Sequence, residues 1–263
     1  MTYETIDFSL EEGVARIVLN RPAAFNALNL QCAKELCDIA NRLGSDSSVR
    51  VAVLTGAGTK AFCAGGDVAA FAADPDNVEL LLKEMTGYIH MAIARFAWMN
   101  APLIGVVNGV AAGAGLSLVA ACDLAIASES ARFTSAYTQI GLSPDGSSTY
   151  YLTRLLGTRR AMELFMLNRT LAADEALEWG LVNQVVPAGA LEDEAGKVVQ
   201  QLASGPTRAY GGIKRLLLTA PSESLESQLE KETRQIVELS TSADGLEGVQ
   251  AFIQKRKPVF KGQ

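Results

Sequence analysis

Two glycine-rich segments bring together residue types that could carry out chemistry in this chain. Residues 64–67 (AGGD) follow an apolar run at 51–55, and residues 108–115 (NGVAAGAG) follow an apolar run at 103–107. Glycine lets the backbone approach a ligand and present its N–H, and a small-residue loop opening into a helix adds the positive end of the helix dipole. Each segment alone also fits an ordinary turn or packing joint. Together they predict two backbone donors for an oxyanion, each worth about 3 kcal/mol in a transition state.

Two ionisable side chains could act beside such donors. Asp145 lies in a Pro/Gly/Ser-rich turn before a helix expected to start near Thr149, so it could cap that helix or hold a carboxylate over a substrate carbon. His90 is the only histidine and lies in a segment with a helical pattern. It could be a packed or solvated residue, which is the more common case, or a general base.

Other catalytic signatures are weak or absent in the sequence. Residues 56–61 (GAGTKA) fit a dinucleotide fingerprint, but AGGD follows where that fingerprint needs a continuous helix. Residues 115–119 (GLSLV) lack the second glycine of a nucleophile elbow, so a serine hydrolase has little support. The four cysteines form no Cys-x-x-Cys pair, and with one histidine no metal site is expected.

The composition describes an ordinary globular protein. Its 263 residues suit one large domain, or one domain with a small appendage, and the formal net charge of −6 argues against nucleic acid or an anionic membrane as a partner. The N-terminal stretch has no apolar core of a secretory signal, and no apolar run is long enough to span a bilayer. These features predict a cytoplasmic protein with reduced thiols.

Periodicity predicts the elements that position these residues. Alternating segments and short apolar runs indicate strands, and spacings of three and four indicate helices. The predicted strands are a hairpin of 3–8 and 14–19 around Glu12-Gly13, then 51–55, 103–107 and 123–127; the predicted helices are 30–43, 78–99 and 114–121. From residue 149 the pattern is mainly helical, with helical periodicity over 222–262. The alternation of strands and helices up to about residue 150 predicts an α/β fold.

Four segments in this order resemble the enoyl-CoA hydratase/isomerase, or crotonase, family. They are AFCAGGD (61–67), NGVAAGAG (108–115), FTSAYTQIGLSPDGSS (133–148) and RRAMELFMLNRTLAADEALEWGLVNQVV (159–186). The resemblance extends over nearly the whole chain and implies a spiral of β-β-α turns with a helical C-terminal region. It implies a spiral core over 1–205 that holds the acyl-CoA site, and an oligomerisation region over 206–263, where the composition changes near Pro206.

The resemblance also implies a site and its partners. The backbone N–H groups of Gly66 and Ala114 would form the oxyanion hole. The acyl-CoA site would be lined by Ala64, Gly65, Gly66, Asp67, Val68, Ala114 and Tyr137, with the Asp67 side chain more structural than catalytic. Coenzyme A would arrive as part of the substrate, with no permanently bound cofactor. The expected assembly is a homotrimer or a dimer of trimers.

The chain departs from the hydratase pattern at two positions. Hydratases of this family carry two catalytic glutamates, where this chain has Ser117 and Tyr137. Adding water to a double bond needs a carboxylate pair, whereas one carboxylate suits a 1,3-proton shift. Asp145 resembles the aspartate of phenylacetate-pathway isomerases, which act on ring-epoxide CoA thioesters and 3-enoyl-CoA. The sequence therefore favours an isomerase with Asp145 as acid and base.

The sequence leaves other functions open besides the isomerase. The 4-chlorobenzoyl-CoA dehalogenases carry an aspartate nucleophile at Asp145 and a histidine base at His90, but they have aromatic residues where Gly66 and Tyr137 stand here. A 2-enoyl-CoA hydratase and a non-catalytic member of the fold are further alternatives. An RNA-binding relative is disfavoured because the chain is acidic and its helices show no Lys/Arg stripe.

Overall fold

Two β-sheets form the centre of the protein in a computed structural model that describes residues 2–263. The larger sheet has the strand order β1-β2-β3-β5-β7-β10, and the smaller has the order β4-β6-β8-β9. The larger sheet consists of β1 (Ile6–Glu11), β2 (Val14–Leu19), β3 (Val51–Gly56), β5 (Leu103–Val107), β7 (Leu124–Ser128) and β10 (Gln184–Val186). The smaller consists of β4 (Ala61–Cys63), β6 (Val110–Ala112), β8 (Arg132–Thr134) and β9 (Thr170–Ala172).

One β-β-α turn repeats along the chain. The strands β3, β5 and β7 are parallel neighbours in the larger sheet, and the strands that follow them, β4, β6 and β8, are parallel neighbours in the smaller one. The helices that follow are α2 (Val68–Ala73) with α3 (Val78–Trp98), then α4 (Ala114–Ala121), then α5 (Ser148–Leu156). The predicted α/β spiral is thus confirmed. The glycine loops, however, follow β4 and β6, because three-residue strands are too short to show in the sequence pattern.

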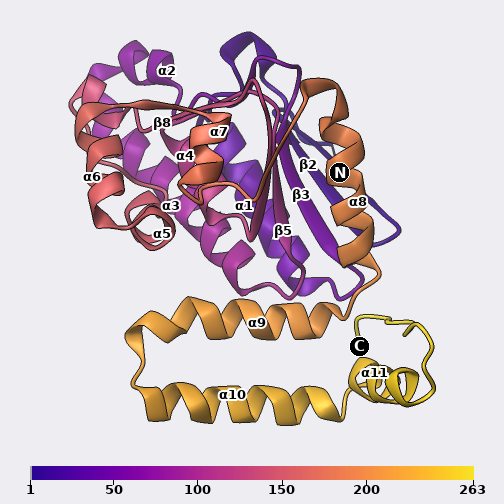
Figure 1. The fold of residues 1–263 in the computed structure, drawn as a ribbon. Helices are drawn as coiled ribbons and strands as arrows, with labels where there is room; N and C mark the ends of the chain where they lie inside the picture. The colour runs from indigo at the N-terminus through magenta and orange to yellow at the C-terminus, as the bar shows by residue number, and fades with distance from the viewer. Residues whose placement is uncertain (1) are drawn as a thin grey trace.

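Helices cover both faces of the larger sheet (Figure 1). On one face α1 (Leu30–Ser45) and α3 pack against each other, and on the other α8 (Leu191–Ala203) crosses β3, β5 and β7. Successive residues of a strand point to opposite faces. Accordingly Val51 and Val53 belong to the apolar cluster under α8, whereas Ala52 and Leu54 belong to the main core.

The hairpin is present, but its first strand lies three residues later than predicted. The register pairs Glu11 with Val14, so that Glu12 and Gly13 alone form the loop. Both loop residues have positive φ, 50° and 80°, as a tight two-residue hairpin loop requires. The first strand therefore runs up to Glu11 and cannot end at residue 8.

The region after residue 149 is mainly helical but also contributes strands. Helices α6 (Thr158–Leu167) and α7 (Ala173–Glu178) flank β9, and β10 completes the edge of the larger sheet beside β7. Short 3₁₀ helices lie between elements: η1 (Pro22–Ala24), η2 (Pro75–Asn77), η3 (Tyr137–Ile140), η4 (Ala188–Ala190) and η5 (Ala220–Ser222). The helical expectation was wrong for β9 and β10, again because each has only three residues.

Three helices form a separate layer at the C-terminal end. They are α9 (Thr207–Thr219), α10 (Leu225–Ser240) and α11 (Ala243–Ile253), and they lie below the sheets in Figure 1. The prediction of helix over 222–262 fails beyond residue 253. There Glu247 accepts from the backbone N–H of Val259 and pairs with Arg256, which fixes an extended tail on α11. The assignment of 206–263 to oligomerisation stays a prediction.

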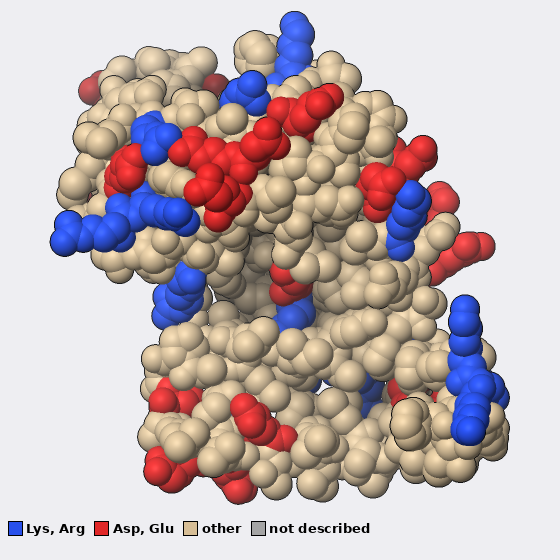
Figure 2. All heavy atoms as spheres, viewed as in Figure 1, with Lys and Arg blue, Asp and Glu red and all other residues tan. Residues whose placement is uncertain are grey.

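A partly buried ion pair ties α9 to the core. The ammonium of Lys214 lies 2.7 Å from Oδ2 of Asp123 and also donates to the carbonyl oxygens of Phe96 and Ala101. Burial raises the pKa of Asp123 and lowers that of Lys214, and each partner opposes the shift in the other. Both residues line a cavity of about 450 Å³ between the core and α9, visible as the hollow in Figure 2.

The helix α3 contains a glycine that weakens it. Gly87 is exposed, and a Cβ added there would meet no atom within 4 Å. We expect Gly87→Ala to raise the free energy of unfolding by about 0.5–1 kcal/mol, because alanine restricts the unfolded chain and favours the helix. Thermal or urea unfolding beside the wild type measures this, and a lower midpoint would contradict it.

Within residues 2–263, no helix has both the length and the apolar character that crossing a membrane requires.

Candidate active site

The two glycine-rich loops meet because the strands before them are neighbours. β4 and β6 pair in parallel, so the loops after them leave the same edge of the smaller sheet. A Cβ built on Gly65 would stand 2.9 Å from the carbonyl oxygen of Ala112 and 3.4 Å from the nitrogen of Ala114. Gly65 also has a φ of +99°, which other residues rarely adopt. A glycine at this position therefore lets the loops approach closely.

The N–H groups of Gly66 and Ala114 are both available to a ligand. The loop is held to Leu28 on either side of Gly66: the N–H of Leu28 donates to the Gly65 oxygen at 2.7 Å, and the N–H of Asp67 donates to the Leu28 oxygen at 2.9 Å. Ala114 begins α4, where helical N–H groups have no intrahelical acceptor. Within residues 2–263, neither N–H has a hydrogen-bond acceptor. Their role as oxyanion donors stays a prediction that this arrangement permits.

Asp145 lines the cavity at these loops, and Tyr137 holds its carboxylate. Tyr137 begins η3 and donates its hydroxyl to Oδ1 of Asp145 at 2.6 Å. Oδ2 accepts no hydrogen bond from residues 2–263. Burial, followed by the negative charge of Asp145, raises the pKa of Tyr137, so its hydroxyl keeps the proton that it donates. Asp145 does not cap the next helix, since α5 has no side-chain cap.

The backbone of Asp145 is fixed by two buried serines. The carbonyl oxygen of Asp145 lies 3.0 Å from the hydroxyl of Ser117 and 2.8 Å from that of Ser148. The Ser117 hydroxyl is also 3.1 Å from that of Tyr137. Because Ser117 belongs to α4, which begins at Ala114, one helix both fixes the backbone of Asp145 and carries a candidate oxyanion donor.

His90 lies beside Asp145 but faces a different cavity. Its Nε2 is 3.7 Å from Oδ2 of Asp145, and the backbone N–H of Gly146 donates to the same nitrogen at 3.2 Å. A nitrogen that accepts an N–H carries no proton, so this geometry describes a neutral ring with its proton on Nδ1. His90 lines a second cavity of about 350 Å³ rather than the one at the glycine loops.

The cavity at the glycine loops has a volume of about 330 Å³ and mainly apolar walls. Among its lining residues Asp145 is the only Asp, Glu, Lys, Arg or His. The predicted residues that line it are Ala64, Gly65, Gly66, Val68, Ala114, Tyr137 and Asp145. Further wall residues, which the sequence does not single out one by one, are Phe71, Leu82, Met85, Thr86, Ile89, Gln139, Ile140, Leu142 and Ser143. No motif marks these residues, because they are ordinary helix and loop residues that come to face one cavity only in the folded chain.

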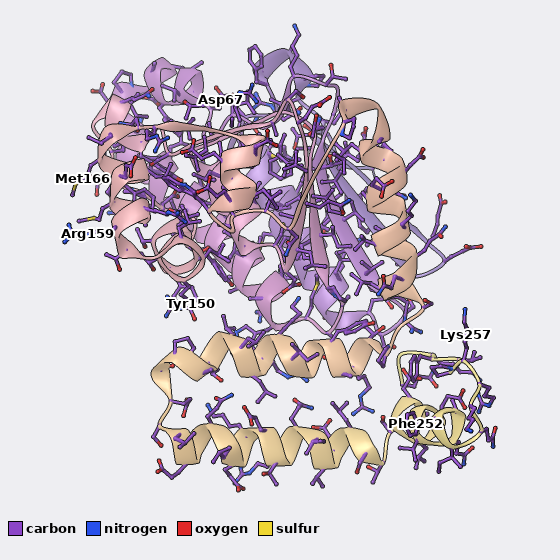
Figure 3. All side chains as sticks on the ribbon, viewed as in Figure 1. Asp67, Tyr150, Arg159, Met166, Phe252 and Lys257 are labelled. Atoms are coloured by element: carbon purple, nitrogen blue, oxygen red, sulfur yellow. The ribbon has the colours of Figure 1, made fainter. Side chains whose placement is uncertain are left out.

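Asp67, predicted to line the acyl-CoA site, is not among the residues that line this cavity. Its carboxylate pairs with Arg21 at 2.8 Å and accepts from the N–H of Ala70, which caps α2. In Figure 3 Asp67 lies at the top of the core, well away from Tyr150 at the edge facing α9. Asp67 therefore shapes the loop that carries Gly66, as expected for a structural side chain.

The described residues offer neither a metal cluster nor an activated thiol. No group of three His, Cys, Asp or Glu within residues 2–263 is placed to hold a metal ion. Burial raises the pKa of the Cys32 and Cys63 thiols to about 12, so both stay protonated at neutral pH. Since the thiolate is the nucleophilic form, these cysteines are unsuited to covalent chemistry.

Comparison with known proteins shows the family of this chain. A family model for enoyl-CoA hydratase/isomerase matches residues 9–263. The chain belongs to this family. An enoyl-CoA hydratase structure from Bacillus anthracis has a TM-score of 0.92 at 34% identity, covering 99% of this chain and 100% of the other.

Relatives of this chain with similar identity carry different activities in their names. A probable enoyl-CoA hydratase from Rhodobacter capsulatus is 40% identical over the whole of both chains. A 1,2-epoxyphenylacetyl-CoA isomerase from Escherichia coli is 38% identical over 97% of each chain. A 4-chlorobenzoyl coenzyme A dehalogenase-2 from Arthrobacter sp is 39% identical over 86% of this chain and 82% of the relative. Because these identities barely differ, the specific reaction has to be argued from the side chains at the site.

Those side chains separate this chain from the two-glutamate pattern of hydratases. Ser117, where one glutamate was expected, is fully buried, and its hydroxyl lies among the oxygens of Gly113, Tyr137 and Asp145. Tyr137, where the other was expected, donates to Asp145. Tyr137 thus holds the carboxylate of Asp145 and Ser117 holds its backbone carbonyl, and neither position supplies a second carboxylate.

Proposed function

We propose that the protein is an acyl-CoA isomerase that moves a double bond by a proton shift through Asp145. The observation that carries the proposal is that one carboxylate, and no second, lines the cavity at the N–H groups of Gly66 and Ala114. A single carboxylate can remove a proton from one carbon and return it to another, whereas hydration needs two groups to handle water.

The proposed reaction begins with the thioester oxygen bound by Gly66 and Ala114. The free Oδ2 of Asp145 removes a proton from C2 of a 3-enoyl thioester, and the released electron pair forms a dienolate whose oxygen carries the charge. The two N–H groups stabilise that charge by about 3 kcal/mol each. Asp145 then returns the proton to C4, which leaves the double bond between C2 and C3 and the carboxylate regenerated. Tyr137 holds Oδ1 throughout, because its proton is retained.

His90 supports a second candidate, hydrolytic dehalogenation of an aryl-CoA. Its imidazole lies 3.7 Å from Oδ2 of Asp145, where a base could activate water against an aryl ester of that aspartate. The lone pair of Nε2, however, accepts from Gly146, so it is engaged in this geometry.

A substrate panel on purified protein tests these candidates. We expect double-bond migration in a 3-enoyl-CoA, measured by the absorbance of the conjugated product. Faster hydration of a 2-enoyl-CoA would instead establish a hydratase and would show that Ser117 and Tyr137 do not exclude that reaction. Halide release from 4-chlorobenzoyl-CoA, lost in His90→Gln, would establish the dehalogenase. Acyl-CoA binding without turnover in any assay would leave a non-catalytic member of the fold.

Tyr137→Phe should slow the isomerisation. It removes the hydrogen bond that holds Oδ1 of the Asp145 carboxylate. A hydrogen bond to a charged group is worth about 1.5–3 kcal/mol, so we expect kcat/KM to fall by about 10- to 100-fold. Tyr137 itself should keep its proton at neutral pH in the wild type, since burial and the charge of Asp145 raise its pKa.

The matched control for that change is Tyr151→Phe. Tyr151 loses the same hydroxyl but has no recorded bond to Asp145, and burial raises its pKa to about 12. We expect wild-type kcat/KM in this variant. Wild-type kcat/KM in Tyr137→Phe as well would remove Tyr137 from the proposed site.

We further propose a cytoplasmic homotrimer or dimer of trimers assembled through 206–263, with coenzyme A arriving only as part of the substrate. The support is apolar surface on α10 and α11: Leu225 and Ile236 are largely exposed, and Phe252, labelled in Figure 3, is 86% exposed. Light scattering of the purified chain tests it, and a monomer at micromolar concentration would overturn it.

A further inference from the structure

Asp145 and His90 lie between two cavities, in a position where protons could leave the active site. Asp145 lines the cavity at the oxyanion loops, while His90 and Ser147 line the second cavity, of about 350 Å³. Asp145 and His90 approach to 3.7 Å between Oδ2 and Nε2. The pair thus stands between a mainly apolar cavity and a second, more open one.

We infer that His90 exchanges the proton held by Asp145 with solvent in the second cavity. This inference rests on the proposed isomerase, in which Asp145 holds a substrate proton between two steps. It assigns His90 a role distinct from activating water for ester hydrolysis.

The protonation of His90 supports this direction of transfer. Nε2 accepts from the N–H of Gly146, so it carries an unprotonated lone pair, which must release Gly146 before it can accept a proton from Asp145. Once Asp145 has taken a substrate proton, its hydroxyl can donate to that lone pair after a side-chain movement of under about 1 Å, which brings 3.7 Å into hydrogen-bond range. The O–H bond breaks, an Nε2–H bond forms, and the imidazole becomes an imidazolium beside a carboxylate.

The exposure of His90 completes the route. Its side chain is 51% exposed, against 29% for Asp145, and Nδ1 has no hydrogen-bond partner within residues 2–263. The imidazolium can therefore turn toward the second cavity and lose the Nε2 proton to water. The path also runs in reverse: solvent protonates Nε2, and the imidazolium then donates that proton to Oδ2. In D₂O the carboxyl group of Asp145 therefore receives a deuteron.

Tyr137 and Ser117 do not offer an equivalent route. The raised pKa of Tyr137 keeps its proton on the hydroxyl, and Ser117 is fully buried. Both lie on the side of Asp145 that faces α4, whereas His90 lies on its exposed side. His90 is the ionisable side chain that meets both Asp145 and the second cavity.

Isotope exchange in D₂O tests the inference separately from the double-bond shift. A 3-enoyl-CoA is incubated with enzyme, and mass spectrometry follows deuterium entering substrate and product while absorbance follows isomerisation. We expect the wild type to incorporate deuterium in most turnovers. In His90→Gln, whose amide oxygen can still accept from Gly146 but cannot carry a proton, deuterium per turnover should fall about 10-fold or more.

Two further variants make the outcome decisive. His90→Phe keeps a ring of similar size in the wall and should lose exchange in the same way, which guards against a local effect of glutamine. Trp98→Phe changes the second cavity on a side away from Asp145 and should keep wild-type exchange. Unchanged deuterium per turnover in both His90 variants, or no incorporation by the wild type, overturns the inference. Exchange at C2 that depends on His90 without double-bond migration upholds it while removing the proposed isomerase.

Discussion

Asp145→Asn is expected to lower kcat for 3-enoyl isomerisation by about 10²- to 10⁴-fold, the usual contribution of a positioned acid–base group. Asparagine preserves the size of the side chain and can still accept the hydroxyl of Tyr137, but it cannot take a proton from C2. The thioester is held by backbone groups and apolar walls, so KM should change little. Steady-state kinetics by absorbance of the conjugated product provides the measurement.

Asp174→Asn is the matched control for the loss of one negative charge. Asp174 is exposed in the first turn of α7 and does not line the cavity. Its kinetics should match the wild type. Activity that survives in Asp145→Asn would remove the aspartate from the mechanism and with it the proposed isomerase.

Gly115→Ala should have the second largest effect, although residue 115 supplies no side chain and no oxyanion donor. A Cβ there would stand 2.1 Å from the carbonyl oxygen of Cys63, which ends β4 just before the loop with Gly66. Because this atom belongs to the backbone, α4 must move away from β4 and carry Ala114 with it. Misplacing one oxyanion donor costs about 10²- to 10³-fold in kcat. Overpacking should also lower stability by about 1–3 kcal/mol.

Gly44→Ala controls for the added methyl group. A Cβ on Gly44, near the end of α1, would meet nothing within 4 Å. Circular dichroism and thermal unfolding establish that Gly115→Ala is folded before its kinetics are compared. Wild-type kcat in the folded variant would show that the spacing of β4 and α4 does not set the oxyanion geometry.

The parts of the site that depend on short stretches of sequence were predictable. Glycines after an apolar strand and an aspartate in a Pro/Gly turn are local features that marked the two loops and Asp145, and the family resemblance singled out Gly66 and Ala114; all three residues line one cavity. Long elements were equally accessible: the helices predicted at 30–43, 78–99 and 114–121 agree with α1, α3 and α4 within two residues at each end.

The parts that depend on contacts across the fold were not predictable in the same way. Ser117 holds the carbonyl oxygen of a residue 28 positions later, and nothing in its neighbourhood marks that bond. The wall residues Phe71 and Met85 come from different helices that face one cavity only in the folded chain. Strands of three residues, such as β4 and β10, are too short for alternation to reveal them.

The site combines backbone donors with replaceable side chains, and this combination affects how such proteins diverge. The candidate oxyanion donors belong to the backbone, so no replacement of their own side chains removes them outright, while positions 117, 137 and 145 contribute replaceable side chains from α4, η3 and the following loop. Substitution at a handful of positions can then exchange one reaction for another while the thioester-binding frame is inherited intact. Such a history would produce relatives of nearly equal identity to this chain that are named for hydration, isomerisation and dehalogenation.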